Sequence, residues 1–126
     1  MTIYQEKLKA LEERTIAFSV SVVKTCGVYS RDVSLRPLID QTIRAATSVG
    51  ANYAEANNAS SKADFKHKIF IAKKEAAETR YWLRVLAELL PDQDFDALQQ
   101  EALELNLIFQ KIISTIKAGG RSGNDT

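Results

Sequence analysis

The sequence predicts an all-α fold, an up-down antiparallel four-helix bundle, from three observations. Glycine and proline are rare, five and two among 126 residues, and they divide the chain into four long segments. Within each segment the apolar residues step alternately by three and four positions, which places them on one face of a helix. The connections between segments are short, and short connections favour antiparallel neighbours that cross at small angles.

The first two predicted helices have clear ends. The first ends at Cys26-Gly27, and its inner face consists of Tyr4, Leu8, Leu11, Thr15, Phe18 and Val22. Ser34 is the candidate N-cap of the second helix, and Pro37 falls in its first turn, where proline is tolerated. This helix is expected to stop near Asn57-Asn58. Its inner face consists of Leu35, Leu38, Ile39, Thr42, Ala46, Val49 and Tyr53.

The third and fourth predicted helices follow the same rules. Ser61-Lys62-Ala63-Asp64 predicts a capping box at the start of the third helix, which Pro91 closes. The heptad seam of this helix consists of Phe65, Ile69, Ala72, Ala76, Thr79, Leu83, Leu86 and Leu90. Asp92 or Asp94 is expected to cap the fourth helix, which should end before Gly119-Gly120. Its inner face consists of Leu98, Ala102, Leu105, Phe109, Ile112 and Ile116. The predicted domain therefore covers residues 1–118, and residues 119–126 are expected to form a disordered tail.

The composition points away from catalysis. A single cysteine, Cys26, permits neither an intramolecular disulfide nor a cysteine zinc site. A di-iron bundle site needs two Glu-x-x-His motifs, whereas His67 is the only histidine and has no glutamate three residues before it. Neither residue has the sequence partners of a catalytic nucleophile or triad. We therefore expect no enzyme activity, no metal and no cofactor.

The N-terminal segment is polar within a few residues, and no run of about 18 apolar residues occurs. We therefore expect neither a secretory signal nor a membrane-spanning helix, and we predict a cytoplasmic protein.

Charge is unevenly distributed along a chain whose net charge is only +1. Between Lys62 and Arg84 there are seven basic and three acidic residues, whereas residues 85–110 carry six acidic and no basic ones. Five of the basic residues fall within a sector of about 40° and extend over about 33 Å of an ideal helix. They are Lys62, Lys66, Lys73, Arg80 and Arg84, called the basic stripe below.

The basic stripe predicts contact with the phosphates of RNA or DNA, and the alternative interpretation is a solvated helix flank. Phe70, Tyr81 and Trp82 fall on other sectors of the same helix, so base stacking is not expected.

A further set of candidate contacts lies outside the inner faces of the second and third helices. Short side chains such as Ser48 and Ala51 let another backbone approach closely, and Gly50 marks a second line of close approach. Glu75 and Glu78 lie among basic residues, which favours ion pairs over a cation site. The predicted structural polar or oligomer contacts are Arg44, Ser48, Asn52, Glu55, Glu75, Glu78 and Trp82. Apolar and small residues left outside the seams indicate a partner, most economically a second copy of the chain.

Two sequence motifs resemble a known family. They run from Gln41 to Ala56 (QTIRAATSVGANYAEA) and from Ala72 to Leu83 (AKKEAAETRYWL), with Ser60 to Phe65 between them. They are similar to the four-helix-bundle family encoded by rRNA intervening sequences. The resemblance implies an up-down bundle that assembles as a ring-like homopentamer, with no established enzyme activity. A related branch, the accessory proteins of diversity-generating retroelements, uses a strongly basic pentamer to engage nucleic acid and a reverse transcriptase. This chain departs from that branch in its near-neutral net charge.

Two hypotheses for function follow. The first is a non-enzymatic oligomer that associates with nucleic acid, above all RNA, through the basic stripe. The second is a structural oligomer that docks a protein partner through the polar face of the second helix. The salt dependence of binding distinguishes the two hypotheses, because affinity that rests on phosphate contacts falls steeply as the salt concentration rises.

Overall fold

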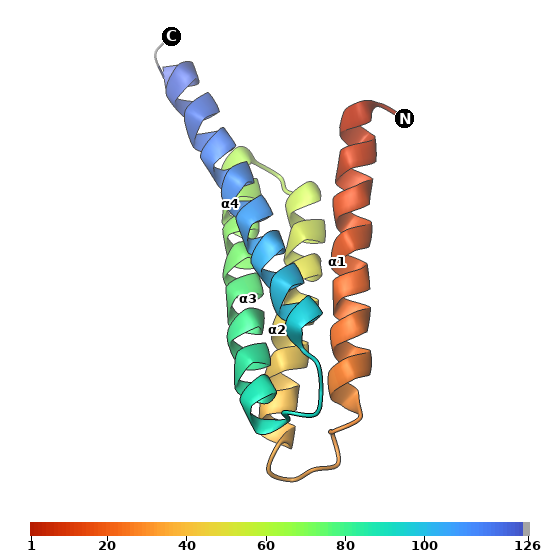
Figure 1. The fold of residues 1–126 in the computed structure, drawn as a ribbon. Helices are drawn as coiled ribbons and strands as arrows, with labels where there is room; N and C mark the ends of the chain where they lie inside the picture. The colour runs from red at the N-terminus through yellow and green to blue at the C-terminus, as the bar shows by residue number, and fades with distance from the viewer. Residues whose placement is uncertain (125–126) are drawn as a thin grey trace.

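The computed structural model describes the backbone of residues 1–124 and the side chains of residues 1–117. These residues form four helices and no strand: α1 (Ile3–Gly27), α2 (Arg36–Asn57), α3 (Lys62–Leu89) and α4 (Asp96–Asn124). α1 and α3 run in one direction and α2 and α4 in the other (Figure 1). The predicted up-down antiparallel bundle is therefore confirmed. Within the part of the chain described, no helix is long and apolar enough to cross a membrane.

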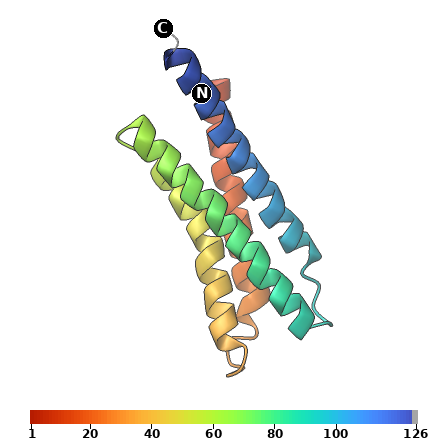
Figure 2. The same cartoon turned by 90° about the vertical axis from the view of Figure 1, so that its left-hand side faces the viewer.

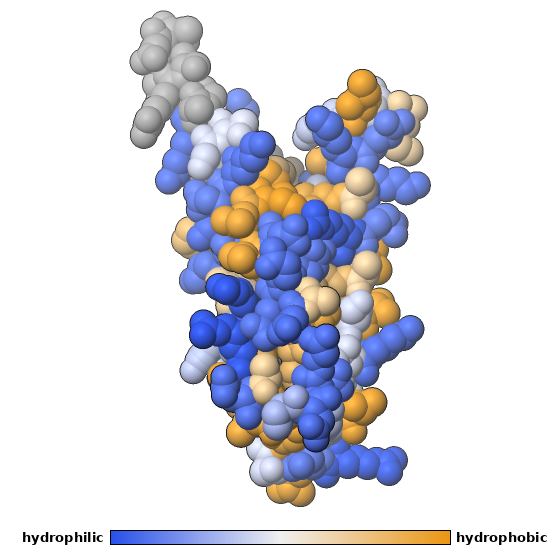
Figure 3. All heavy atoms as spheres, in the orientation of Figure 1, coloured by the Kyte–Doolittle hydropathy of each residue, from blue (hydrophilic) through white to orange (hydrophobic). Residues whose placement is uncertain are grey.

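The four helices do not pack equally. α3 packs extensively against α2 and α4, α1 packs mainly against α2, and the contact between α1 and α4 is the smallest. The N-terminal end of α1 and the C-terminal end of α4 project beyond the α2–α3 connection (Figures 1 and 2), and the two ends diverge in the view of Figure 1. A space-filling view shows apolar residues at the surface between α4 and α1, below the projecting end of α1 (Figure 3).

Side chains cap three of the four helices, though not always the ones expected. Thr2 and Gln5 form a reciprocal capping box at the start of α1, which the sequence analysis missed. Ser61 accepts the backbone N–H of Asp64 at 3.0 Å, which is one half of the predicted box on α3. Asp94, and not Asp92, accepts the N–H of Asp96 at the start of α4.

The predicted cap of α2 is wrong. Leu35 occupies the N-cap position and makes no side-chain cap. Instead, the carboxylate of Asp32 accepts the N–H and the hydroxyl of Ser34 and the N–H of Leu35. These bonds to the charged form lower the pKa of Asp32. Asp32 therefore organises the turn before α2, and Ser34 serves as a donor to it.

The core follows the predicted faces along most of the bundle. Fully buried large side chains from all four helices meet there, and Tyr53 of α2 packs on Phe109 of α4 with ring centroids 5.8 Å apart. Phe95, in the turn before α4, is 1% exposed although no helical pattern predicted it. Ala45 and Ala56 are also buried, so α2 buries a wider face than the predicted one.

One predicted core position is wrong. Tyr4 is 67% exposed, because it lies on the projecting end of α1 where no neighbouring helix covers it. On α4 the predicted Ile112 is half-buried and packs against the core, and Ile113, which was not predicted, is buried. The α4 backbone also continues past Gly119 to Asn124. The tail predicted for residues 119–126 reaches beyond the described residues and stays a prediction.

Candidate nucleic-acid interface

The basic stripe of α3 runs along the side of this helix that faces α4. The carbonyl of Lys73 accepts a hydrogen bond from the side-chain amide of Asn106 on α4 at 2.9 Å. Near one end of the stripe, Lys66 and Gln110 of α4 line a cavity of about 410 Å³. Near the other end, Arg80 lines a cavity of about 250 Å³ with three polar residues of α4, namely Asp96, Gln99 and Gln100. The stripe therefore borders a seam between two helices and does not lie on an isolated helix surface.

The five cations of the stripe lack partners among the residues whose side chains are described. None of their side chains makes an ion pair or hydrogen bond with any residue in the part of the chain whose side chains are described. Three of them are exposed, and Lys73 and Arg80 are half-buried. By contrast Arg14, Arg44 and Lys68 all pair with carboxylates. The stripe is thus a set of positive charges that the fold leaves uncompensated.

Two aromatic side chains lie beside the stripe, contrary to the sequence-based expectation. Phe70 is 47% exposed and lines the same cavity as Lys66, with the ammonium of Lys74 at 5.7 Å from its ring centroid. Tyr81 is 55% exposed and lines a cavity of about 490 Å³ with Arg80 and Arg84. Helical angle alone places these rings on other sectors than the stripe, but the rings and the long cationic side chains line the same hollows.

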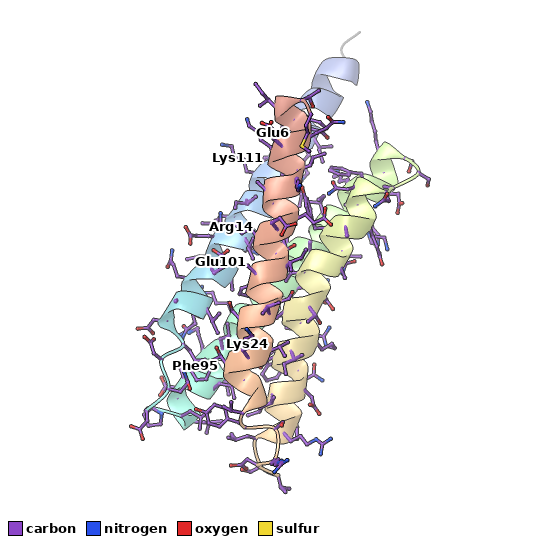
Figure 4. All side chains as sticks on the ribbon, turned by 90° about the vertical axis from the view of Figure 1, so that its right-hand side faces the viewer. Glu6, Arg14, Lys24, Phe95, Glu101 and Lys111 are labelled. Atoms are coloured by element: carbon purple, nitrogen blue, oxygen red, sulfur yellow. The ribbon has the colours of Figure 1, made fainter. Side chains whose placement is uncertain are left out.

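Acidic residues near the stripe are few. Glu88 lines the cavity of Tyr81, and Asp96 lines the cavity shared by Arg80 and α4. The acidic charge of α4 is largely directed elsewhere. Arg14 of α1 donates two hydrogen bonds of 2.7 Å to the carboxylate of Glu101, which raises the pKa of Arg14 (Figure 4). Acidic residues of α4 therefore bind Arg14 of α1, and they leave most of the positive charge of the stripe uncompensated.

The polar face between α2 and α3 contains ion pairs, as the sequence analysis expected for its glutamates. Arg44 of α2 pairs with Glu75 at 3.2 Å and with Glu78, both on α3. Lys68 of α3 pairs with Glu55 of α2 at 2.7 Å, and this contact raises the pKa of Lys68. Glu75 and Glu78 thus both pair with one guanidinium group, as expected from the preference for ion pairs over a cation site.

Three other residues predicted for this face behave differently. The side-chain amide of Asn52 donates to the carbonyl of Ser48 within its own helix, at 2.8 Å, and makes no hydrogen bond to another helix among the described residues. Ser48 is half-buried. Trp82 is half-buried and stacks on Tyr81 with centroids 5.1 Å apart and ring planes 5° from parallel. Its indole N–H is buried without a hydrogen-bond partner.

The candidate reactive side chains are not arranged for catalysis. Cys26 is fully buried, and burial raises the pKa of its thiol to about 11, so the nucleophilic thiolate is scarce at neutral pH. His67 is exposed and lines the cavity of Lys66 and Phe70 without a hydrogen-bond partner in the described chain. Among the described residues, no three His, Cys, Asp or Glu side chains are grouped as metal ligands.

A second surface, between α1 and α2, combines exposed apolar side chains with small residues. Ile16, Val20 and Val23 of α1 are each between 41% and 48% exposed. Ile16 and Val20 line a groove of about 280 Å³ with Gly50 and Ala51 of α2. The sequence analysis identified the small residues but not the apolar ones, although their steps of four and three along α1 form a second stripe beside the main one.

Comparisons with known proteins agree with this architecture. A family model described as 23S rRNA-intervening sequence protein matches residues 6–111. A solved structure is also similar: a protein of unknown function from the S23 ribosomal protein family of Bacteroides thetaiotaomicron. It is 32% identical in sequence, with a TM-score of 0.74, and the match covers 81% of this chain and 96% of that one. None of the curated proteins matches the chain.

Proposed function

The chain belongs to the 23S rRNA-intervening sequence protein family, and we propose that it acts as a non-enzymatic accessory protein that associates with nucleic acid through the basic stripe of α3. The observation that carries this proposal is a set of five cations along one helix flank that make no ion pair within residues 1–117. Uncompensated charges of one sign, spread over about 33 Å, match the spacing of several backbone phosphates.

The paired cations of the same fold strengthen this argument. Glu75, Glu78 and Glu55 neutralise Arg44 and Lys68 between α2 and α3, although α3 carries both kinds of cation. Carboxylate partners therefore lie where α2 and α3 contact each other, whereas the stripe has none among the described residues. The family name refers to 23S rRNA, which makes RNA the first nucleic acid to test. A cytoplasmic location follows from the same proposal.

Self-assembly is the second part of the proposal. A stripe that neutralises about three phosphates binds weakly, whereas several copies held together raise the effective concentration and the avidity. The exposed apolar surface of α1 beside Gly50 and Ala51 supports association with further copies of the chain. The resemblance implies a homopentamer. Light scattering coupled to size exclusion tests it, because a mass near 14.0 kDa at micromolar concentration contradicts self-assembly.

Binding across a salt series tests the nucleic-acid part. Replacing Lys73, Arg80 and Arg84 with glutamine should weaken binding of labelled RNA and DNA and make the salt dependence shallower, since fewer counterions are released. The matched control replaces Lys7, Lys9 and Lys24 with glutamine, which removes the same charge from exposed positions of α1. Equal losses in the two triple variants would indicate a general charge effect and contradict the stripe.

The alternative function, docking of a protein partner through the polar face of α2, has less support. Arg44 and Glu55 on that face are already engaged by α3. If the parent protein and the triple glutamine variant gave identical nucleic-acid binding curves that do not depend on salt, this alternative would be favoured.

A further inference from the structure

We infer that the α3 flank is specific for single-stranded nucleic acid, with unpaired bases stacking on Phe70 and Tyr81 while the basic stripe holds the phosphates. This inference rests on the proposed function and adds the strandedness of its ligand. Proteins that bind single strands combine a positive groove with aromatic side chains on which bases stack. Both features are present on one flank of α3.

The two rings lie along one line of the helix. Phe70 and Tyr81 are eleven positions apart, which corresponds to about 16 Å of helix length and a rotation of only about 20°. Stacked neighbouring bases lie about 3.4 Å apart, so the two rings must take bases that are several nucleotides apart. Between them, Lys73 and Arg80 are placed to hold the intervening phosphates. Along α3 the two cations thus lie between the two rings, as phosphates lie between two bases of a strand.

The hollow at Phe70 suits a base. It has a volume of about 410 Å³, and Ala63 and Ile113 add apolar surface beside the ring. Gln110 supplies an amide that both donates and accepts hydrogen bonds, as base edges require, and Lys66 supplies a positive charge. The cation of Lys74 over the ring indicates that a face of Phe70 is directed to the surface.

The hollow at Tyr81 is held more rigidly. Trp82 stacks on one face of the Tyr81 ring, nearly parallel to it, while 55% of the Tyr81 residue stays exposed. A ring that is already oriented loses little conformational entropy when a base packs on it. Arg80 and Arg84 line the same cavity of about 490 Å³, and Glu88 weakens the attraction for phosphate there. We therefore expect Phe70 to contribute at least as much as Tyr81.

Duplexes cannot use these rings, because their bases are stacked and paired within the helix and present only edges in the grooves. A duplex would contact the stripe through phosphates alone.

The test compares four labelled probes of about 20 nucleotides: oligouridine, oligothymidine, an abasic DNA strand and a DNA duplex. The abasic strand keeps the phosphates and removes every base. The parent protein should bind both base-bearing single strands about tenfold or more tighter than the abasic strand and the duplex. Preference for oligouridine over oligothymidine would assign the site to RNA, and equal binding would assign it to single strands of either kind.

Phe70→Leu and Tyr81→Leu test the rings directly. Each should reduce the preference for base-bearing over abasic strands several-fold, without changing the salt slope, because every cation remains. Tyr4→Leu is the matched control, since Tyr4 is an exposed aromatic residue on α1, away from the stripe. Circular dichroism melting checks that each variant is folded. If Tyr81→Leu unfolds because the Tyr81–Trp82 stack is lost, Phe70→Leu alone still tests whether the rings contact bases.

The outcomes separate the two proposals. Equal binding of abasic, duplex and base-bearing probes, with salt-dependent loss in the stripe variant, would overturn this inference and leave the proposed function standing. No binding of any probe by the parent protein would overturn both.

Discussion

The flanks of the two central helices, α2 and α3, differ in their contacts and in their charge. α2 is closed on both sides: Gly50 brings it against Thr15 of α1, and Arg44 joins it to α3. α3 packs on both α2 and α4, but its two flanks differ in charge. The flank beside α4 carries two exposed rings and the cations of the stripe, which make no ion pair with any residue whose side chain is described. Charge on one flank of α3 thus holds helices together, and charge on the other is available to a ligand.

This difference explains why charge counts along the chain are a poor guide to binding. α3 contains both kinds of cation, and Lys66 and Lys68 are only two residues apart, yet Lys68 is paired with Glu55 and Lys66 is not. The angle around the helix decides the role, because a rotation of about 200° moves a side chain from one neighbour to the other.

The largest expected effect is on the closed α1 side of α2. A Cβ added at Gly50 would lie 2.9 Å from the hydroxyl oxygen of Thr15 and 3.1 Å from its Cβ. Gly50→Val should therefore force α1 away from α2 and lower the free energy of unfolding by about 2 to 3 kcal/mol. Thermal and urea unfolding measure this loss. Gly27→Ala is the control, since nothing lies within 4 Å of its added Cβ, and an equal loss in Gly27→Ala would contradict the steric explanation.

The buried thiol of Cys26 on α1 should make the free energy of unfolding depend on pH. Burial raises the pKa of Cys26 to about 11, above the value of about 9 expected in the unfolded chain. The folded state therefore holds this proton more tightly. The stabilisation is fully present below pH 9 and is lost as the pH rises through about 11, by on the order of 2 kcal/mol, because each pKa unit corresponds to about 1.4 kcal/mol. Urea unfolding between pH 8 and 11 measures it. Cys26→Ala should flatten this dependence, and an unchanged pH profile would assign the loss to other groups.

A smaller effect is expected on the α2 side of α3. Glu78→Gln removes one carboxylate from Arg44 and should lower the free energy of unfolding by about 1 kcal/mol, because both side chains are nearly half exposed and solvent screens the pair. Nucleic-acid affinity should stay the same or rise slightly. A melting temperature equal to that of the parent, together with unchanged assembly, would indicate that this carboxylate serves a ligand and not the fold.

The smallest effect on stability is expected on the open flank. Replacing Lys73, Arg80 and Arg84 with glutamine breaks no ion pair in the described chain and should change the free energy of unfolding by less than about 0.5 kcal/mol per residue. Thermal melting at low salt measures it, since removal of like charges can even stabilise the fold. A large loss of stability would mean that the stripe is structural and would remove the contrast between the two flanks.

Much of the fold was predictable because helix formation and burial depend on local patterns. The periods of three and four along α2 and α3 identify the buried faces, and Pro91 and the Asn57-Asn58 pair mark helix ends. The errors lie where local patterns compete with the surroundings. Ser34 has the chemistry of a cap, but it donates to Asp32, which accepts three hydrogen bonds in the turn before α2, and α2 has no side-chain cap.

The candidate site was predictable only in part. The sequence by itself determined the composition of the stripe, because five cations recur near one helical angle whatever α3 packs against. It also determined that Glu75 and Glu78 have basic neighbours. Only the tertiary structure decided that Arg44, from a different helix, engages both glutamates. It also placed the stripe beside α4 without an ion pair to any carboxylate in the described part of the chain. It also decided that Phe70 and Tyr81 share cavities with stripe cations. The physical reason is that helical periodicity fixes angles within one helix, whereas the partner of a long side chain depends on which neighbouring helix its flank meets.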